Sequence, residues 1–348
     1  MDVRTAVPLA ELTTLRLGGP ARRVLEPAGT DELVETVRHL DRAGEPVLIV
    51  GGGSNLVVAD AGFPGTVVRL ATRGVSERRQ GDDTVAVTVA AGEPWDDLVE
   101  RSVAEGLAGV EALSGIPGLA GATPVQNVGA YGQEVGDTLL GVTVLDRAEG
   151  SVRTMTPAQC RLGYRTSLLK GSDRYLVVDV TLGLHRRRVS GPLAYAELAT
   201  SLGADLGGTA PTADVRATVL ALRRSKGMVL DPADLDTASA GSFFTNPVLP
   251  APGPDRLPAD APRYDAGPGL VKVPAAWLVE HAGFARGYGH GAARISGKHT
   301  LALTNRGGAT TVELLALAGE VRAGVRRAFG VELRPEPLLV GCSIPEPG

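Results

Sequence analysis

Apolar side chains recur every three or four residues in several segments, which is the spacing of one face of an α-helix. The pattern is clearest over 30–42, where acidic residues occupy the first turn and Gly44 follows the end. Thr310 and Glu313 have the spacing of a capping box, so a long helix is predicted to run from there to Gly330. Further helices are predicted at 94–106, 212–224 and 274–282.

Alternating or continuous runs of valine and leucine predict β-strands between these helices. The strongest is YLVVDVTL over 175–182. A basic turn is expected at 185–190, and an exposed loop rich in proline, glycine and aspartate at 250–268. Short strands in the middle and helices towards each end predict an α+β protein with more than one domain. The other strands are expected at 46–50, 56–58, 84–90, 142–145 and 152–155.

Length and composition are those of a soluble protein of two or three domains. Of the 348 residues, 43% are hydrophobic and 21% are charged. A net charge of −4 argues against a nucleic-acid or anionic membrane partner. Cys160 and Cys342 form no CxxC pair, which favours a reducing compartment. The N-terminus lacks the apolar stretch of a signal peptide, and no apolar run has the length of a membrane span, so a cytoplasmic location is expected.

The segment 113–132, LSGIPGLAGATPVQNVGAYG, is dense in glycine and carries the amides Gln126 and Asn127. It is too irregular for a helix and too apolar for a disordered linker. Glycine lets backbone N–H groups approach an anion closely, so the segment favours a loop around a phosphorylated cofactor. A tight packing loop is the alternative.

A second glycine-rich turn follows a predicted strand in VLIVGGGSNL, over 47–56. A Rossmann fold would continue into a helix, but a strand-like sequence follows here, and Leu56 stands where the third glycine is needed. Ser54 and Asn55 are suited to support a pyrophosphate, although a plain hairpin is equally compatible. GAARISGK over 291–298 lacks the P-loop's hydroxyl residue after the lysine, and the five histidines show no metal-ligand spacing, so no metal is expected.

Three short segments place polar side chains in restrained settings. GSFFTNP could anchor two aromatic rings and direct Ser242 and Asn246 into a cleft, or could be a plain core strand. Arg165 in GYRTS and Glu336 between two prolines have local alternatives that are more ordinary, a salt bridge and a surface turn.

Taken together, GGGSN, IPGLAGATPVQNVGAYG, GYRTS, AGSFFTNP and PEP resemble, in order and spacing, the UDP-N-acetylenolpyruvoylglucosamine reductase family, over nearly the whole chain. The resemblance implies a flavin-binding domain of the vanillyl-alcohol-oxidase type and a separate α/β substrate-binding domain. The implied boundaries are 1–65 with 331–348 and 66–210 for two flavin-binding subdomains, and 211–330 for the substrate domain.

The resemblance also implies the reaction and its components. NADPH would reduce a non-covalently held FAD, which would then reduce UDP-N-acetylglucosamine enolpyruvate to UDP-N-acetylmuramate for peptidoglycan and cell-wall synthesis. Arg165 would stabilise developing negative charge, Ser242 would donate the proton, and Glu336 would lie near the same enolate. The residues expected to hold the UDP-sugar are Tyr195, Lys226 and Asn246. Those expected to hold FAD are Gly51, Gly52, Gly53, Ser54, Asn55, Leu56, Gly118, Gly121, Ala122, Thr123, Gln126, Asn127, Gly129, Ala130 and Tyr131.

The chain departs from the family pattern in two places. Leu338 stands where the familiar form has an arginine, and the 250–268 segment is longer than expected. The segment 191–226 resembles the longer of two family types, whose loop closes over the substrate. Two other functions remain as alternatives: a sugar or lactone oxidase on the same flavin scaffold, and a non-catalytic protein that binds a nucleotide sugar.

Overall fold

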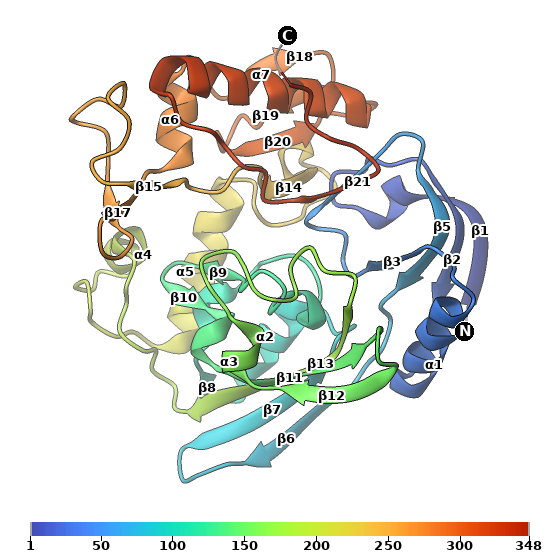
Figure 1. The fold of residues 1–348 in the computed structure, drawn as a ribbon. Coiled ribbons are helices and arrows are strands. Elements are labelled where there is room, and N and C mark those ends of the chain that lie inside the picture. The colour runs from blue at the N-terminus through green and yellow to red at the C-terminus, as the bar shows by residue number, and fades with distance from the viewer. Residues whose placement is uncertain (1, 347–348) are drawn as a thin grey trace. The chain divides into compact units, whose positions relative to one another are not determined.

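The computed structural model describes residues 2–346, which form two compact units of mixed helices and strands (Figure 1). The first unit comprises 2–6, 21–52 and 64–229, and the second comprises 7–20, 53–63 and 230–346. The α+β expectation is confirmed, whereas the division into three domains at the boundaries given above stays a prediction. None of the helices described for residues 2–346 is both long and apolar enough to cross a bilayer.

A mainly antiparallel sheet with the path β12–β11–β13–β7–β6 forms the centre of the first unit, and β8 pairs with β13 at its end. Alternate side chains of β7 and β13 are fully buried in one apolar core. β13 is longer than predicted because His185 and Arg186 still pair with β7 and β8, so the basic turn begins only after them. The strands are β6 (Val75–Arg79), β7 (Thr84–Ala90), β8 (Leu107–Ala108), β11 (Leu139–Asp146), β12 (Ser151–Met155) and β13 (Tyr175–Arg186).

A second sheet, in the order β1–β2–β5–β3, accompanies α1, whose bounds are those predicted. The sequence analysis missed β1, β2, β5 and β6, because charged residues interrupt the apolar alternation in most of them. The strands of this sheet are β1 (Asp2–Pro8), β2 (Pro20–Glu26), β3 (Val47–Val50) and β5 (Phe63–Arg69). The helices of the first unit are α1 (Thr30–Arg42), α2 (Trp95–Ala104), α3 (Pro157–Cys160), α4 (Ala196–Ser201) and α5 (Thr212–Ser225).

The first turn of α2 fixes the start of the glycine-rich segment. The buried Trp95 donates from Nε1 to the Leu113 carbonyl at 3.1 Å. Asp96 accepts the Gly115 amide at 2.6 Å and the Arg216 guanidinium of α5 at 2.6 and 3.0 Å. Burial opposes ionisation of Asp96, yet the hydrogen bonds from Arg216 and Gly115 hold its pKa below its ordinary value. One carboxylate therefore ties α2, α5 and the glycine-rich segment together.

The second unit contains a four-stranded sheet, β14–β20–β19–β18, against which α7 packs (Figure 1). A parallel pair, β4–β21, joins two segments that lie far apart in the sequence. The strands are β4 (Leu56–Val58), β14 (Ser239–Ser242), β15 (Val248–Pro250), β16 (Tyr264–Asp265), β17 (Leu270–Lys272), β18 (Gly289–His290), β19 (Ala293–Ile295), β20 (Ala302–Asn305) and β21 (Leu338–Val340). The helices are α6 (Ala275–His281) and α7 (Thr311–Phe329).

The 250–268 segment is more ordered than the exposed loop that its composition predicted. It contributes to a small sheet, β15–β17–β16, and its Leu257 and Ala261 are buried in the core of the second unit. The Arg263 guanidinium donates to five backbone carbonyls within 252–261, among them Pro252 at 2.9 Å and Ala261 at 2.8 Å. One internal cation thus replaces the hydrogen bonds that regular structure would provide.

The predicted capping box of α7 is confirmed. The Thr310 hydroxyl accepts the Glu313 amide at 3.2 Å, and Glu313 accepts the Thr310 amide at 2.7 Å. Asp60 accepts two further first-turn amides, from Thr311 and Val312, at 2.8 and 3.0 Å. The amides that a helix start leaves without partners are therefore well satisfied here.

We expect Thr310→Ala to lower the free energy of unfolding by about 1 kcal/mol, because the Glu313 amide loses its acceptor. Thr310→Ser keeps the hydroxyl and should lie close to the parent protein. Urea denaturation followed by circular dichroism measures both variants. Equal destabilisation by Ala and Ser would show that the hydroxyl does not carry the effect.

Candidate active site

The two predicted cofactor segments meet backbone to backbone in the first unit. A β-carbon at Gly52 would lie 2.6 Å from the Gly118 Cα, so no larger residue fits there. A β-carbon at Gly51 would meet only Leu119 and Ala122 side chains at ordinary distances of 3.8 to 3.9 Å. Within residues 2–346, the amides of Gly51, Gly52 and Gly118 donate to no protein acceptor. Amides without protein acceptors in a glycine turn fit the oxygens of a phosphate-bearing ligand.

Two other glycines are explained by packing within the protein. A β-carbon at Gly121 would lie 2.4 Å from the Ala91 Cβ, and the Gly121 amide donates to the Ala91 carbonyl at 3.0 Å. In the second unit, a β-carbon at Gly53 would overlap the Leu12 carbonyl oxygen at 1.7 Å. Loss of flavin after substitution at either position would therefore not distinguish a cofactor contact from a folding defect.

Asn127 is buried, and its carboxamide forms hydrogen bonds with one side chain and with two backbone groups. Its Nδ2 donates to Glu134 Oε2 at 2.7 Å and to the Gly163 carbonyl at 3.3 Å. Its Oδ1 accepts the Gly136 amide at 2.9 Å. The side chain thus holds the glycine-rich segment against the GYRTS turn, and any contact with FAD would come from its backbone.

Arg165 lies in a tight turn that is fastened to the glycine-rich segment. Gly163 and Thr166 exchange two backbone hydrogen bonds around it, at 3.0 and 3.2 Å. The Arg165 guanidinium donates to the backbone carbonyls of Asn127 and Gly129. Lys170 Nζ in turn donates to the Arg165 carbonyl at 2.9 Å. Lys170 could not be identified from the sequence, because a lysine five residues downstream of a turn has no distinctive pattern.

Three candidate residues have left-handed backbone conformations, which non-glycine residues rarely adopt. Asn127, Tyr131 and Arg165 have φ angles of 46°, 48° and 53°. Such strain persists only where the surroundings hold it, and it clusters at functional sites. The strained conformations therefore support a functional role for these turns independently of the sequence motifs.

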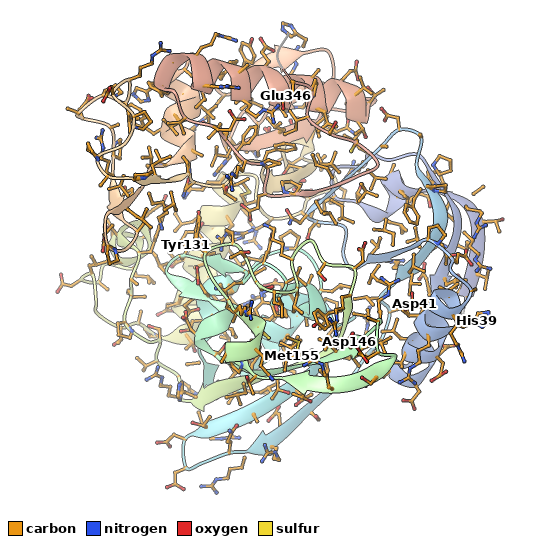
Figure 2. All side chains as sticks on the ribbon, viewed as in Figure 1. His39, Asp41, Tyr131, Asp146, Met155 and Glu346 are labelled. Atoms are coloured by element: carbon orange, nitrogen blue, oxygen red, sulfur yellow. The ribbon has the colours of Figure 1, made fainter. Side chains whose placement is uncertain are left out.

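Tyr131 and Gly132 form the two-residue turn of the hairpin between β9 (Gly129–Ala130) and β10 (Gln133–Glu134) (Figure 2). The Tyr131 ring meets the Tyr195 ring edge to face, with 5.4 Å between centroids, and Lys226 Nζ lies 5.7 Å from the Tyr131 centroid. Burial raises the pKa of Tyr131 to about 12, so its hydroxyl stays protonated further into the alkaline range than that of an exposed tyrosine. The turn thus brings a predicted cofactor residue to two predicted substrate residues, Tyr195 and Lys226.

The remaining cofactor candidates of the first unit lie along the same segment. The Thr123 hydroxyl donates to the Ala120 carbonyl at 2.8 Å, and Ala122 is exposed. Gln126, which directly precedes Asn127, is half-buried.

Ser242 ends β14 in the second unit, beside an irregularity in the pairing with β20. Ser239 pairs with Thr304 and Ser242 with Ala302, so β14 carries one residue more than β20, and Gly241 has a φ of 72°. A bulge of this kind redirects a side chain at a strand end. Phe243 and Phe244 follow it and are buried, as one alternative for this segment predicted. The half-buried Ser242 hydroxyl has no hydrogen-bond partner within residues 2–346.

The backbone places Glu336 directly beside this segment. The Glu336 amide donates to the Phe243 carbonyl at 2.9 Å, and Phe244 bridges to Pro335. On the other side, Asn55 Nδ2 donates to the Glu336 carbonyl at 3.4 Å. Backbone and side-chain hydrogen bonds thus bring together in one unit three motifs that are separated by almost 300 residues.

Two further candidates of the second unit have structural contacts. Asn246 Oδ1 accepts the Ala275 amide at 2.8 Å at the start of α6, which leaves its amide nitrogen for other contacts. Leu338 is exposed and pairs with Leu56 in the β21–β4 ladder. Ser54 is half-buried beside Asn55. Arg165 belongs to the first unit, and Ser242 and Glu336 to the second.

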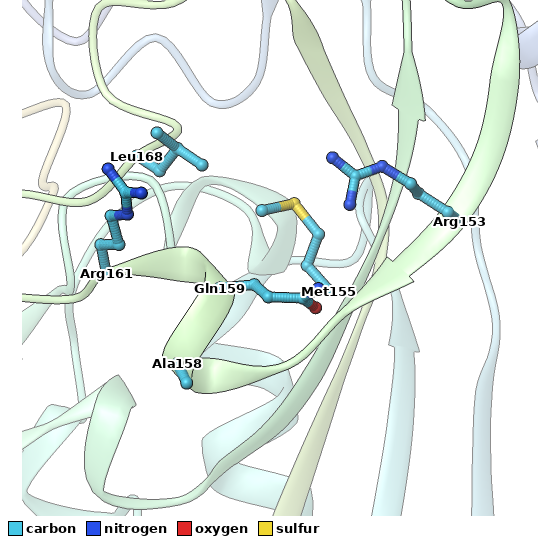
Figure 3. Close-up of a pocket in the computed structure, with 6 residues that line it drawn as sticks. All are labelled: Arg153, Met155, Ala158, Gln159, Arg161 and Leu168. Carbon is cyan, nitrogen blue, oxygen red and sulfur yellow. The ribbon is translucent and has the colours of Figure 1, made fainter.

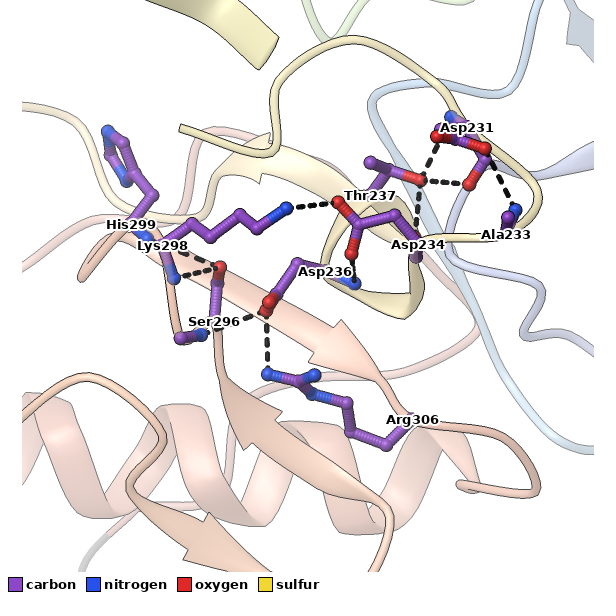
Figure 4. A network of polar contacts seen from close by, with 10 residues as sticks. Asp231, Ala233, Asp234, Asp236, Thr237, Ser296, Lys298, His299 and Arg306 are labelled. Atoms are coloured by element: carbon purple, nitrogen blue, oxygen red, sulfur yellow. Dashed lines mark hydrogen bonds and ion pairs between the residues drawn. The ribbon is translucent and has the colours of Figure 1, made fainter. Parts of the chain in front are cut away.

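One cavity and one group of ion pairs include none of the candidate residues. A cavity of about 400 Å³ in the first unit is lined by Arg153, Met155 and Arg161, among others (Figure 3). In the second unit, Asp234 binds Lys298 and Asp236 binds Arg306, each at 2.6 Å, which ties the rejected P-loop-like segment to the turn before β14 (Figure 4). Within residues 2–346, no group of three or more histidine, cysteine or acidic side chains could hold a metal ion.

Comparisons with known proteins cover both parts of the chain. Residues 21–156 match the FAD binding domain family, which confirms the flavin-binding part of the expected fold. Residues 231–340 match the C-terminal domain of UDP-N-acetylenolpyruvoylglucosamine reductase.

Relatives of that name resemble the chain over nearly its full length. The protein of Thermobifida fusca is 57% identical over 97% of this chain and 98% of its own length, and that of Nocardia farcinica is 55% identical over 98% and 91%. The crystal structure of UDP-N-acetylenolpyruvylglucosamine reductase from Thermus caldophilus superposes with a TM-score of 0.67 at 26% identity, covering 98% of this chain and 99% of that one. The chain belongs to the UDP-N-acetylenolpyruvoylglucosamine reductase family.

Proposed function

We propose that this protein reduces the enolpyruvyl group of UDP-N-acetylglucosamine enolpyruvate with electrons that NADPH delivers through non-covalently bound FAD. The observation that carries the proposal is the hydrogen bonding between the Ser242 and Glu336 segments in the second unit, because the Ser242 hydroxyl has no partner within residues 2–346. Family membership supplies the reaction class, and the residue roles below are part of the proposal.

The residues fit FAD in the first unit. Amides of Gly51, Gly52 and Gly118, which lack protein acceptors, would hold the pyrophosphate of the cofactor. The two glycine-rich segments, 47–56 and 113–132, contain neither histidine nor cysteine, so no covalent flavin link is available from them. When bound, FAD supplies the hydride that the methylene carbon of the substrate receives.

Arg165 stabilises the charge that this addition creates. Adding a hydride to the methylene carbon pushes an electron pair onto the adjacent carbon and its carboxylate. A guanidinium binds a carboxylate through parallel N–H donors, and its charge persists at every working pH. The carbonyls of Asn127 and Gly129 hold the guanidinium in place, so little reorganisation is needed during the reaction.

Ser242 gives the proton that completes the reduction. Its hydroxyl would transfer the proton to the carbanionic carbon, and solvent would then reprotonate it. A serine is a weak acid, so the role requires close positioning beside a strongly basic carbon. Glu336 is held next to the serine segment by the Phe243 carbonyl and would lie near the same carbon. Tyr195, Lys226 and Asn246 would hold the UDP-sugar.

The visible spectrum of the purified protein tests the overall reaction. Flavin bands should be present, should bleach with NADPH, and should return when the enolpyruvyl substrate is added under anaerobic conditions. A flavin that stays with the precipitated protein in acid would instead favour the oxidase alternative. A colourless protein that does not take up FAD would favour the binding protein.

Gly51→Ala should weaken FAD binding by about tenfold or more, because a β-carbon would displace a phosphate oxygen from a charge-assisted hydrogen bond. Its β-carbon has room in the protein itself, so the free energy of unfolding without flavin should change little. Flavin fluorescence on titration with FAD measures the affinity. Gly81→Ala, at an exposed glycine without neighbours within 4 Å, is the control. Full FAD affinity in Gly51→Ala would remove this turn from the pyrophosphate site.

Ser242→Ala should leave bleaching by NADPH near its normal rate, because that half-reaction needs no proton at the substrate carbon. Reoxidation by the enolpyruvyl substrate should slow on the order of 10²-fold or more, the usual cost of a lost acid. Stopped-flow absorbance separates the two half-reactions. Ser76→Ala, at an exposed position on β6, should change neither rate. Equal slowing of both half-reactions by Ser242→Ala would exclude the acid role.

Arg165→Lys should slow reoxidation by substrate on the order of 10²-fold or more while flavin content stays intact, because lysine lacks the planar fork. Glu336→Gln should spare NADPH bleaching and also slow reoxidation. Groups that act on one transition state are coupled, so the two losses should not add in the double variant. Arg161→Lys, at a nearby arginine that shares the left-handed backbone, is the control. Strictly additive losses would assign Arg165 and Glu336 to separate tasks.

A further inference from the structure

Lys226 forms an ion pair with an acidic side chain of the protein, Glu197. Its Nζ lies 2.6 Å from Glu197 Oε2. The side chains of Lys226 and Glu197 are 30% and 41% exposed, so the pair is accessible to a ligand from solvent. The resemblance points to Lys226 but not to Glu197, because the two lie 29 residues apart and belong to no common motif.

Glu197 lies two residues from a second candidate for substrate binding, Tyr195. It lies in the first turn of α4, and Tyr195 is the residue that precedes this helix. The Tyr195 ring meets the Tyr131 ring edge to face, and Lys226 Nζ approaches the same Tyr131 ring. The ion pair of Lys226 and Glu197 therefore lies next to the contact between the Tyr131 and Tyr195 rings.

The ion pair of Lys226 and Glu197 is electrostatically incompatible with a diphosphate bound to Lys226. A lysine ammonium is a compact point charge with three donors. A diphosphate placed on it would bring further negative charge against the Glu197 carboxylate at hydrogen-bond distance, and like charges in such proximity lower affinity. An uncharged nucleoside has no such conflict, since it does not need Lys226.

We propose that Glu197 is a latch that occupies Lys226 until a nucleoside diphosphate displaces it. The proposal rests on the role assigned to Lys226 in the proposed function. Glu197 thereby lowers the affinity for the diphosphate. No covalent step is involved.

Isothermal titration of the full-length, FAD-loaded protein with UDP and with uridine tests the latch. Glu197→Gln keeps the size of the side chain and removes its charge. Its Kd for UDP should fall by about twofold to fivefold, the scale of one exposed ion pair. Its Kd for uridine should not change. Glu105→Gln removes the charge that faces Arg101 at 2.9 Å, and is the matched control that should bind UDP like the parent protein.

Lys226→Met separates the latch from the role of the lysine. This variant should bind UDP more weakly, and adding Glu197→Gln to it should bring no gain. If Lys226→Met weakens UDP binding while Glu197→Gln leaves it unchanged or weakens it, the latch is wrong and the role of Lys226 stands. If Lys226→Met binds UDP normally, both the latch and this part of the proposed function are overturned. Circular dichroism at the titration temperature establishes that each variant is folded.

Discussion

Two backbone hydrogen bonds organise the candidate site of the second unit, one from the Glu336 amide to the Phe243 carbonyl and one from the Thr245 amide to the Arg334 carbonyl. They fix the register between the segment that carries Glu336 and the segment that carries Ser242. The buried Phe243 and Phe244 rings keep that register, since a slip by one residue would turn an aromatic side chain out of the core. The β4–β21 pairing places Asn55 on the other side of Glu336. Hydrophobic burial of two rings thus determines where a carboxylate and a hydroxyl stand.

In the first unit, hydrogen bonds from polar side chains fix the position of the candidate residues. Its glycine-rich segment has almost no regular secondary structure, so its backbone cannot rely on a helix or sheet for support. The Asn127 carboxamide and the Arg165 guanidinium connect it to the GYRTS turn instead. Because Asn127 is buried, its three hydrogen bonds are costly to leave unmade, and that cost makes the loop rigid. The candidate cation of the reaction is therefore also a structural element of the loop beside it.

Sequence reasoning succeeded where one local cause determines the structure. The bounds of α1 and the capping box of α7 follow from periodicity and from hydrogen bonds three residues apart, and the structure has both. It failed where the cause is distant. The polar strand β6 forms through its ladder with β7. The 250–268 segment gains order from Arg263 and from burial of Leu257 in a core that local composition does not reveal. The motifs identified the candidate side chains, but the partners of Lys226 and Arg165, namely Glu197 and Lys170, come from the fold alone.

The glycines show why density of one residue type is incomplete evidence for a cofactor. Gly121 is required because Ala91 is too close, and Gly132 because a two-residue hairpin turn needs a left-handed conformation at that position. Neither fact says anything about a ligand. Gly51 differs, because a β-carbon would fit there and yet its amide has no acceptor within the described chain. A backbone donor that the protein leaves without an acceptor, at a position where the protein itself does not require glycine, is the observation that separates a cofactor cradle from a packing loop.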